Sequence, residues 1–319
     1  MSWRALPPRL RHGIVVLTVV ATACGVGPWI AGDPTAIVDP AQAALLAPAS
    51  ARWVVELRDG SRTAAVTAQR TEAGWILAGH GEPRTIPTGA VINVRRHIFW
   101  LGSDALGRDV LARLLWGGRV SLAVGLIALL VALGLGIAVG LLAGWRGGFL
   151  DGVLMRLVDA LLAFPALFLL LLVAAVFRPS LSVLVLLLGG LSWMGVARLL
   201  RGQVLSLKER EFVLAARGIG ASPLRIAFVH VLPNTVTPLA QDAALRLGDL
   251  ILAEASLSFL GFGVAPPLPS WGGMVADGGE VLGTAWWLIV APGVAISAVV
   301  IGAALLADGL GELARERQA

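Results

Sequence analysis

Long runs of apolar residues constrain this chain more than any other feature of its sequence. Of its 319 residues, 57% are hydrophobic and only 14% are charged, and the mean hydropathy is +0.83. A helix needs about 20 consecutive apolar residues to cross the hydrocarbon core of a bilayer. Six windows approach that length, at residues 13–31, 119–143, 157–177, 181–200, 235–262 and 286–307. The sequence therefore predicts an all-α polytopic membrane protein with about six transmembrane helices.

Basic residues at the ends of these windows predict the orientation of the chain. They precede the first window and gather again between the fourth and fifth, as Arg4, Arg9, Arg11, Arg198, Arg201, Lys208, Arg210, Arg217 and Arg225. Short loops rich in arginine and lysine face the cytoplasm. Residues 1–31 are expected to comprise a cytoplasmic N-terminus and the first transmembrane helix. An even number of crossings then places the tail, residues 308–319, on the cytoplasmic side as well. The core at 119–307 is expected to hold the remaining helices.

Residues 32–118 form a long segment between the first two windows and are expected to be external. Within it, residues 52–98 alternate between polar and apolar types, and Asp59-Gly60 is a strong hairpin signal. The pattern predicts a small β-rich insertion. It is too short to bury a large core by itself. A docking or lid role and a structural decoration without function are equally good interpretations.

The end of the external segment, residues 104–117, carries the pattern of an amphipathic helix. Asp104 is of a type that caps helices. The apolar stripe consists of Leu106, Val110, Leu111, Leu114 and Leu115, and Arg108, Asp109 and Arg113 lie opposite. We expect an interfacial helix at the outer membrane surface, with its charged side chains on a solvated face.

Residues 201–234 form a loop between the fourth and fifth windows, and its second part has the marks of two short helices joined by a tight turn. Gly220 tolerates a left-handed conformation, Ser222 is a good helix cap, and Pro223 suits a first helical position. Leu232 precedes Pro233, which disfavours helical dihedrals. We therefore expect the second short helix to end there, and Asn234 to cap the next one.

Three segments resemble permease subunits of binding-protein-dependent ABC importers. The first has two alanines, a glycine after three intervening residues, and a later Leu-Pro pair, at Ala215, Ala216, Gly220, Leu232 and Pro233. The second and third, 101–122 and 254–274, resemble the dipeptide, oligopeptide and nickel branch of that family. The resemblance implies a type I ABC importer permease core. Its fold class is thus an all-α membrane core with a small β-rich external insertion.

In that family the loop inserts into a cleft of the ATPase subunit and transmits its motion. The resemblance therefore implies that the residues that couple to the ATPase are Ala215, Ala216, Arg217, Gly220, His230, Leu232 and Pro233. The family commonly has an acidic residue before the two alanines, whereas this chain has Leu214. The loop is expected to be a mechanical joint without chemistry of its own.

The chain has no nucleotide site, since a P-loop needs lysine followed by serine or threonine and the only lysine, Lys208, precedes Glu209. The resemblance implies two partner ATP-binding subunits that hold ATP and magnesium. It also implies a second homologous permease, an extracytoplasmic solute-binding protein, and a place in the bacterial cytoplasmic (inner) membrane. Short peptides or nickel chelates are the expected solutes. Nucleic-acid binding is not expected, because the arginines are scattered.

Four charged residues fall within the fifth window: Asp242, Arg246, Asp249 and Glu254. A charge at the centre of a transmembrane helix costs about 2.5–3.5 kcal/mol, which makes such groups functional candidates. Spacings of four and three residues place the first three on one helix face. We expect this face to line the translocation pathway or the dimer interface, and Glu254 either to meet substrate or to serve packing.

An ion-coupled secondary transporter that binds its ion through these carboxylates is the alternative. A membrane-embedded hydrolase is a weaker hypothesis, because no paired catalytic constellation occurs. No catalytic or metal site is expected, since the four histidines are far apart and the one cysteine, Cys24, lies in the first window. Co-purification with an ATPase separates the importer from the alternative.

Overall fold

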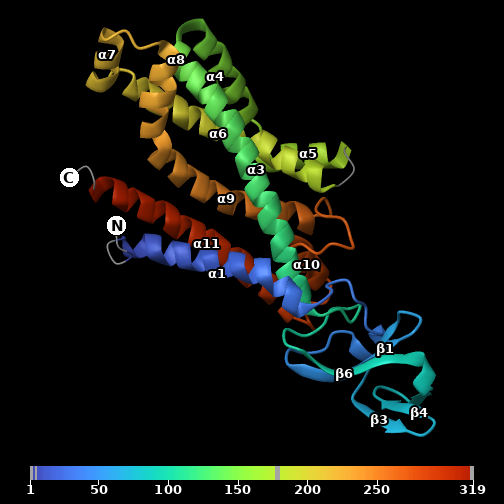
Figure 1. Ribbon diagram of the computed structural model, residues 1–319. Helices are drawn as coiled ribbons and strands as arrows, with labels where there is room; N and C mark the ends of the chain where they lie inside the picture. Colours follow the sequence, from blue (N-terminus) through green and yellow to red (C-terminus); the bar gives the residue numbers. More distant parts are fainter. Residues whose placement is uncertain (1–2, 4–5, 177–179, 317–319) are drawn as a thin grey trace. The chain divides into compact units, whose positions relative to one another are not determined.

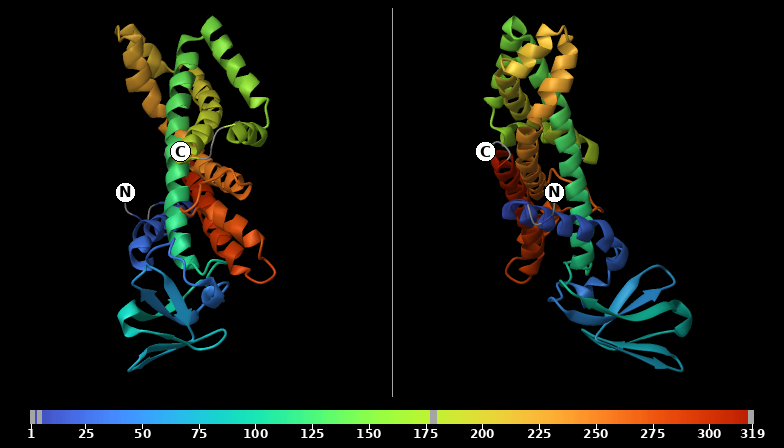
Figure 2. Two further views of the ribbon diagram at one scale, coloured as in Figure 1. Left: turned by 90° about the vertical axis from the view of Figure 1, so that its right-hand side faces the viewer. Right: turned by 60° about the vertical axis from the view of Figure 1, so that its left-hand side comes forward.

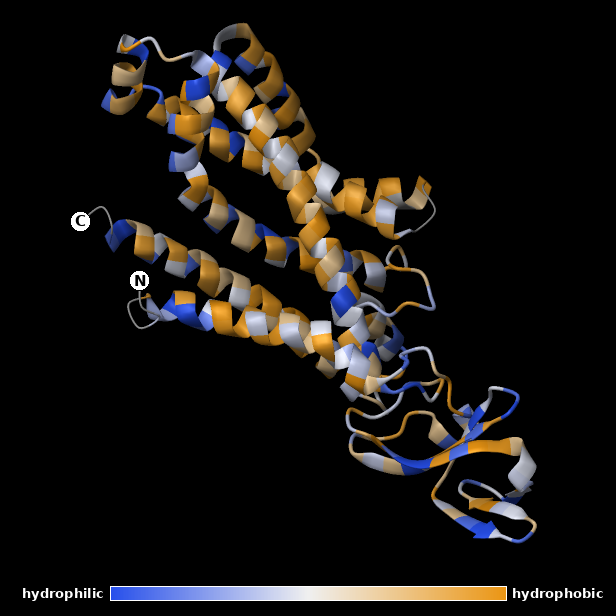
Figure 3. Cartoon of the chain, in the orientation of Figure 1, coloured by the Kyte–Doolittle hydropathy of each residue, from blue (hydrophilic) through white to orange (hydrophobic). Residues whose placement is uncertain are grey.

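The structure is a computed structural model that describes residues 3, 6–176 and 180–316. It is mainly helical (Figure 1), and four of its described helices are long and apolar enough to cross a membrane. These are α1 (Pro8–Ala31), α3 (Val110–Arg146), α6 (Leu181–Leu207) and α11 (Trp287–Glu316). Most of their residues have the colours of hydrophobic residues in Figure 3. The chain is therefore a multi-pass helical membrane protein.

The other two apolar windows differ from the expectation of continuous apolar spans. Residues 157–177 are divided between α4 (Gly148–Leu162) and α5 (Ala166–Val176). Pro165 explains the break, because proline has no N–H to donate and disfavours helical dihedrals in the preceding Phe164. The expected uninterrupted span at 157–177 is therefore wrong. The fifth window, 235–262, forms α9 (Val236–Phe259), which is long enough to cross but contains four charged residues.

The chain divides into two compact units. Unit 1 comprises residues 1–20, 122–257 and 296–319, and unit 2 comprises residues 21–121 and 258–295. Unit 1 contains α4, α5, α6 and the loop that precedes α9. Its core includes buried residues of α3, α6, this loop and α9: Leu141, Val196, Leu200, Val204, Val213, Ala216, Ile226, Ala227, Val231 and Leu239.

Within unit 1, three glycines four residues apart bring α3 and α6 into backbone contact. They are Gly136, Gly140 and Gly144. A Cβ atom added at Gly140 would lie 2.5 Å from the Ala197 carbonyl oxygen, and one at Gly144 would lie 2.8 Å from the Val204 Cβ. Small residues at this spacing allow membrane helices to approach closely. The close contact was not predicted above, although the repeated spacing of four residues is a signal for it in the sequence.

In unit 2, residues 50–99 form two small antiparallel sheets (Figure 2). The first has the order β2-β1-β6, with β1 (Ser50–Leu57), β2 (Arg62–Ala65) and β6 (Val91–Phe99). The second has the order β3-β4-β5, with β3 (Thr67–Thr71), β4 (Gly74–Ala78) and β5 (Arg84–Ile86). Gly60 has a φ of +85°, as the expected turn between β1 and β2 requires. Both sheets are short. The first packs on the preceding segment, which contains α2 (Pro40–Ala43). The second packs on the first, with Leu77 in one buried cluster with Val55 and Ala65.

The separate interfacial helix expected at 104–117 is not formed. Residues 104–109 are a loop in which Gly107 has a φ of +72°, and α3 begins at Val110 and continues without interruption to Arg146. Asp109 caps it, because its Oδ1 accepts bonds from the amides of Leu111 (2.8 Å) and Ala112 (3.2 Å). Asp104 and Asp109 are both suitable helix caps. A helix cannot start at Asp104, because Gly107 between the two has a left-handed conformation.

Candidate functional site

Residues 211–234, which we call the coupling segment, join α6 to α9 within unit 1. The segment consists of α7 (Glu211–Gly218), a turn, α8 (Pro223–Arg225), a π-helical turn (Ile226–Val231) and the start of a 3-10 turn (Leu232–Thr235). Gly220 has a φ of +82°, and the Ser222 hydroxyl oxygen accepts a bond from the Arg225 amide at 3.4 Å. Pro223 is at the start of α8. The expected turn and helix start are confirmed.

The expected helix stop at Leu232 and cap at Asn234 are wrong. The chain stays helical through the π-helical and 3-10 turns and leads directly into α9. Pro233 lies in the first turn of the 3-10 helix, where a missing N–H removes no helical bond. The side-chain amide of Asn234 donates through its Nδ2 to the His230 carbonyl oxygen at 2.6 Å instead of capping α9. A proline therefore changes the type of helix here and does not end it.

One face of the coupling segment is buried against α6. Val213, Ile226 and Val231 pack in one cluster with Leu200 and Val204 of α6. Ala216 is also in this cluster and only 5% exposed, so it does not belong to the surface that a partner would meet, contrary to expectation. The repeat of about three residues between Val213 and Ala216 turns both toward the core. The cluster fixes the segment to α6 and the end of α3.

The opposite face of the coupling segment is exposed and apolar. It carries six large hydrophobic side chains: Phe212, Leu214, Ile219, Leu224, Phe228 and Val229. Ile219, next to Gly220, is 88% exposed. Ala215 and Gly220 are also exposed, and the hydropathy of the segment can be followed in Figure 3. We call this set the apolar face; exposed apolar surface of this kind marks an interaction site.

The remaining expected coupling residues occupy varied environments. The Arg217 guanidinium lies over the Trp145 ring, 5.5 Å from its centroid. His230 and Leu232 are half-buried and Pro233 is exposed. Their role in coupling stays a prediction.

An ion pair ties α6 to α4 just before the coupling segment. The Arg201 guanidinium donates to both carboxylate oxygens of Asp151, at 2.5 and 2.7 Å. These bonds hold the pKa of the Asp151 carboxyl below its ordinary value. Bidentate pairs of this kind fix geometry as well as charge. The start of the loop at 201–234 is thus anchored to α4.

The charges on α9 form a pair and not the expected triad. The Arg246 guanidinium donates to both carboxylate oxygens of Asp242, at 2.9 and 2.8 Å, and to the Ser192 carbonyl oxygen of α6 at 3.0 Å. The expected pair at four-residue spacing is confirmed. Asp249 is exposed and forms no ion pair with Arg246 among the described residues, because the guanidinium is turned toward α6.

Glu254 is fully buried on α9. It therefore does not line an open path in this conformation, and the idea that it contacts substrate stays a prediction.

Gly195 on α6 makes room for the Arg246 side chain of α9, since a Cβ atom at Gly195 would lie 2.8 Å from the Arg246 Nη2.

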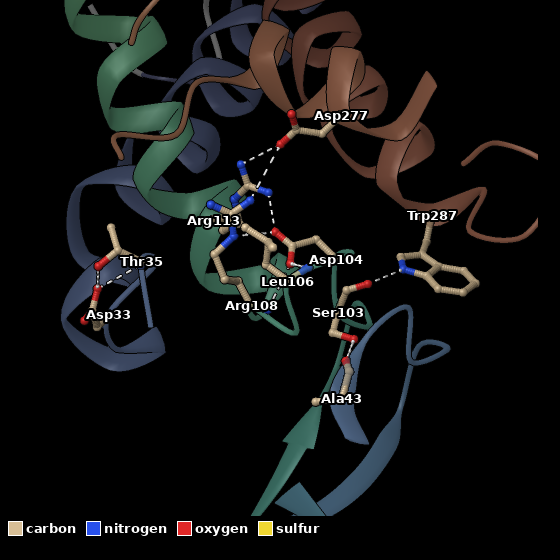
Figure 4. A network of polar contacts seen from close by, with 10 residues as sticks. All are labelled: Asp33, Thr35, Ala43, Ser103, Asp104, Leu106, Arg108, Arg113, Asp277 and Trp287. Atoms are coloured by element: carbon tan, nitrogen blue, oxygen red, sulfur yellow. Dashed lines mark hydrogen bonds and ion pairs between the residues drawn. The ribbon is translucent and has the colours of Figure 1, made fainter. Parts of the chain in front are cut away.

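A buried arginine network lies in unit 2 (Figure 4). Arg113 donates to Asp104 at 2.5 Å and to Asp277 of α10 (Trp271–Gly279) at 2.9 Å, and Arg108 donates to Asp104 at 2.6 Å. Asp104 is 2% exposed. The expected solvated face is therefore wrong for these residues. Two arginines balance two aspartates, which is the condition for burying such charges without a large penalty.

The network connects segments distant in sequence within unit 2. The indole N–H of Trp287 donates to the Ser103 carbonyl oxygen at 3.3 Å, and the Ser103 hydroxyl donates to the Ala43 carbonyl oxygen at 2.5 Å (Figure 4). Neither contact was predicted from the sequence. Partners separated by up to 184 residues leave no local signal.

These features define a polytopic helical membrane protein with exposed apolar residues on the coupling segment. Within the described part of the chain, no group of three or more His, Cys, Asp or Glu residues could hold a metal ion. A family model described as "Binding-protein-dependent transport system inner membrane component" matches residues 136–317. Since this range is more than half of the chain, the protein belongs to that family of transport permeases.

Several curated relatives are permeases of peptide transport systems. The chain is 46% identical over 210 residues to the dipeptide transport system permease protein DppC of Escherichia coli (strain K12), covering 66% of this chain and 70% of the relative. It is 39% identical over 211 residues to DppC of Alkalihalophilus pseudofirmus, covering 66% and 69%. A putative peptide transport system permease protein of Brucella suis biovar 1 is 41% identical over 238 residues, covering 75% and 79%.

Among solved structures, an inward-facing form of the MetNI methionine ABC transporter is similar in fold. The TM-score is 0.50 at 17% identity, and the match covers 62% of this chain and 96% of that chain. At this identity the similarity shows the fold alone. The predicted membership in the ABC importer permease family is confirmed.

Proposed function

We propose that this chain is a transmembrane subunit of an ATP-driven ABC importer that carries dipeptides or related short peptides across the bacterial inner membrane. The relatives named as dipeptide permeases, at 39–46% identity, support the substrate class. Nickel chelates, also transported by this branch, are the other cargo to test. The observation that carries the coupling function is the apolar face of the coupling segment, which is exposed on a loop firmly packed against α6.

The apolar face docks against a separate ATPase subunit. Two such subunits bind ATP and magnesium and hydrolyse the ATP, because this chain has no P-loop of its own. Their closure moves the coupling segment. Since that segment shares a buried cluster with α3 and α6, these helices move with it. ATP binding and hydrolysis shift the equilibrium between the inward-open and outward-open states of the permease. The permease itself catalyses no reaction.

The complete importer contains further components. A second homologous permease completes the pathway, and an extracytoplasmic binding protein delivers the solute. In this chain six segments cross the membrane, with α9 and the combined end of α4 and α5 added to the four apolar helices, and both termini are cytoplasmic. The charged pair of Asp242 and Arg246 lines the pathway. An ion-coupled secondary transporter is not favoured, because Arg246 already neutralises Asp242.

Co-purification tests the docking function. The tagged chain is expressed with its partner permease and ATPase subunits, and bound ATPase and ATP-dependent uptake of labelled dialanine in proteoliposomes are measured. We expect Ile219→Asp to reduce ATPase recovery and uptake at least about tenfold, because a charge desolvated in the interface costs more than about 1.4 kcal/mol. Gly220→Arg should uncouple hydrolysis from uptake or prevent assembly.

Val66→Asp is the matched control, because it places the same charge at another exposed apolar residue, outside the coupling segment. It should leave ATPase recovery unchanged. Wild-type ATPase recovery and uptake by both Ile219→Asp and Gly220→Arg would contradict docking through this face. Uptake by the purified chain without any ATPase would identify a secondary transporter instead.

A further inference from the structure

A cavity of about 710 Å³ lies in unit 2, between residues 33–42 and strands β2, β4 and β5. Its volume falls within the range of about 300–1,000 Å³ that is usual for small-molecule sites. It lies outside residues 136–317, which the family model matches. The family relationship therefore assigns no role to it.

The cavity has an apolar floor and a charged rim. Ala64, Ala65 and Leu77 are buried residues of the floor. The rim carries charges of both signs, on Asp33, Asp39, Glu82, Arg62 and Arg84. A few polar groups over an apolar surface are the usual composition of a ligand site. The mixed charge fits a ligand that itself carries both charges.

Hydrogen bonds hold the wall of the cavity in place. The Gln42 side chain donates to the His80 carbonyl oxygen at 2.6 Å and accepts from the His80 amide at 2.8 Å. Asp33 accepts bonds from the Thr35 amide and hydroxyl through its Oδ1, at 2.8 and 2.6 Å, which lowers its pKa and keeps it ionised. Because this wall is already ordered, less conformational entropy of the protein is lost when a ligand binds.

Two rim groups remain available to a ligand. Arg84 is 70% exposed at its side chain, and its Nη1 lies 3.9 Å from the Asp39 Oδ2, too far for a hydrogen bond. The Asp33 Oδ2 has no hydrogen bond within the described part of the chain, since both bonds to Thr35 use Oδ1. By contrast, Asp39 already accepts bonds from Ala41 and Thr63.

We propose that this cavity binds a short zwitterionic peptide, with the peptide carboxylate on Arg84 and its ammonium group on Asp33. The choice of a peptide rests on the proposed transport function. The cavity is a binding site additional to the translocation pathway. It holds solute at the permease itself.

Equilibrium binding to the purified full-length chain in lipid nanodiscs tests the site. The probes are dialanine, dialanine amide, which lacks the carboxylate, and N-acetyl-dialanine, which lacks the ammonium group. Calorimetry should show dialanine binding to the wild type and weaker binding of both analogues. Arg84→Gln should weaken dialanine binding about tenfold, as expected for a lost charged hydrogen bond, and leave dialanine amide binding unchanged.

The same logic applies at the other end of the peptide. Asp33→Asn should weaken dialanine binding about tenfold and leave N-acetyl-dialanine binding unchanged. Arg70→Gln, an exposed charge change on β3 outside the cavity, is the matched control and should bind dialanine as the wild type does. Absence of dialanine binding to the wild type, or equal binding by both cavity variants, would overturn the proposal.

Uptake by the assembled importer separates this proposal from the proposed function. If dialanine does not bind in the cavity but ATP-dependent uptake of dialanine is normal, only the proposal of the cavity site is overturned. Dialanine binding at the cavity without any uptake by the importer overturns peptide import and leaves the cavity site standing.

Discussion

At the scale of single residues, the buried carboxylate of Asp104 depends on its two arginines. Arg113→Met should lower the free energy of unfolding by about 2–3 kcal/mol, because it removes one of the two arginines from a carboxylate that remains buried. Asp277→Asn should cost less than about 1 kcal/mol, since the Asp277 side chain is 49% exposed. Thermal unfolding in detergent measures both. Equal losses in the two variants would contradict the network as described.

The pair on α9 gives a second prediction at this scale. Arg246→Leu should impair peptide uptake while membrane insertion and assembly persist, as expected if the pair lines the pathway. The double variant Asp242→Asn/Arg246→Leu should be less impaired than Arg246→Leu alone, because it leaves no uncompensated carboxylate. Uptake in proteoliposomes and recovery of the assembled complex are the measurements. Normal uptake by Arg246→Leu would count against a pathway role.

Residue-level expectations held where the chemistry is local. The left-handed Gly220, the cap at Ser222 and the pair of Asp242 with Arg246 each depend on residues within four positions. The partners of Arg113 could not be predicted, because Asp277 is 164 residues away. The burial of Glu254 could not be predicted either, because glutamate is almost never fully buried and no residue near it in the sequence signals burial.

At the scale of elements, the contact between α3 and α6 requires the absence of a side chain at Gly140. Gly140→Ala should destabilise the protein, because the added Cβ would meet the Ala197 backbone and force the helices apart. We expect a loss of about 1–3 kcal/mol in thermal unfolding. Gly134→Ala, on the same helix with nothing within 4 Å of the added atom, is the control. It should be neutral or stabilising by up to about 1 kcal/mol.

A melting temperature for Gly140→Ala equal to that of Gly134→Ala would contradict the close approach of the two helices.

Element types were easier to predict than their ends. Five of the six apolar windows correspond to one long helix each, even though Pro28 and Pro292 lie inside two of these helices. Only the window at 157–177 is divided, at Pro165. The start of α3 was harder, because Asp104 and Asp109 are both good caps and only the left-handed Gly107 decides between them.

At the scale of the whole molecule, residues 50–99, which hold the two small sheets, form a segment whose ends meet. The Ala49 amide donates to the Phe99 and Trp100 carbonyl oxygens at 2.9 and 3.2 Å. Replacing residues 50–99 with a short glycine linker should therefore leave membrane insertion and ATPase recovery near wild-type levels. Dialanine binding at the cavity should be lost. Absence of the deleted protein from the membrane fraction would show that this segment is needed for folding.

The glycine stripe of α3 has a mechanical consequence for the importer. Two helices in backbone contact have little free volume between them. We therefore expect α3 and α6 to move as one rigid pair, which we call the strut. The coupling segment packs onto one end of the strut through Val213 and Ile226. A push delivered there is not absorbed by local deformation. In the importer proposed above, a displacement of the coupling segment would therefore move α3 and α6 together, and the travel of the ATPase subunits would set how far these helices rotate.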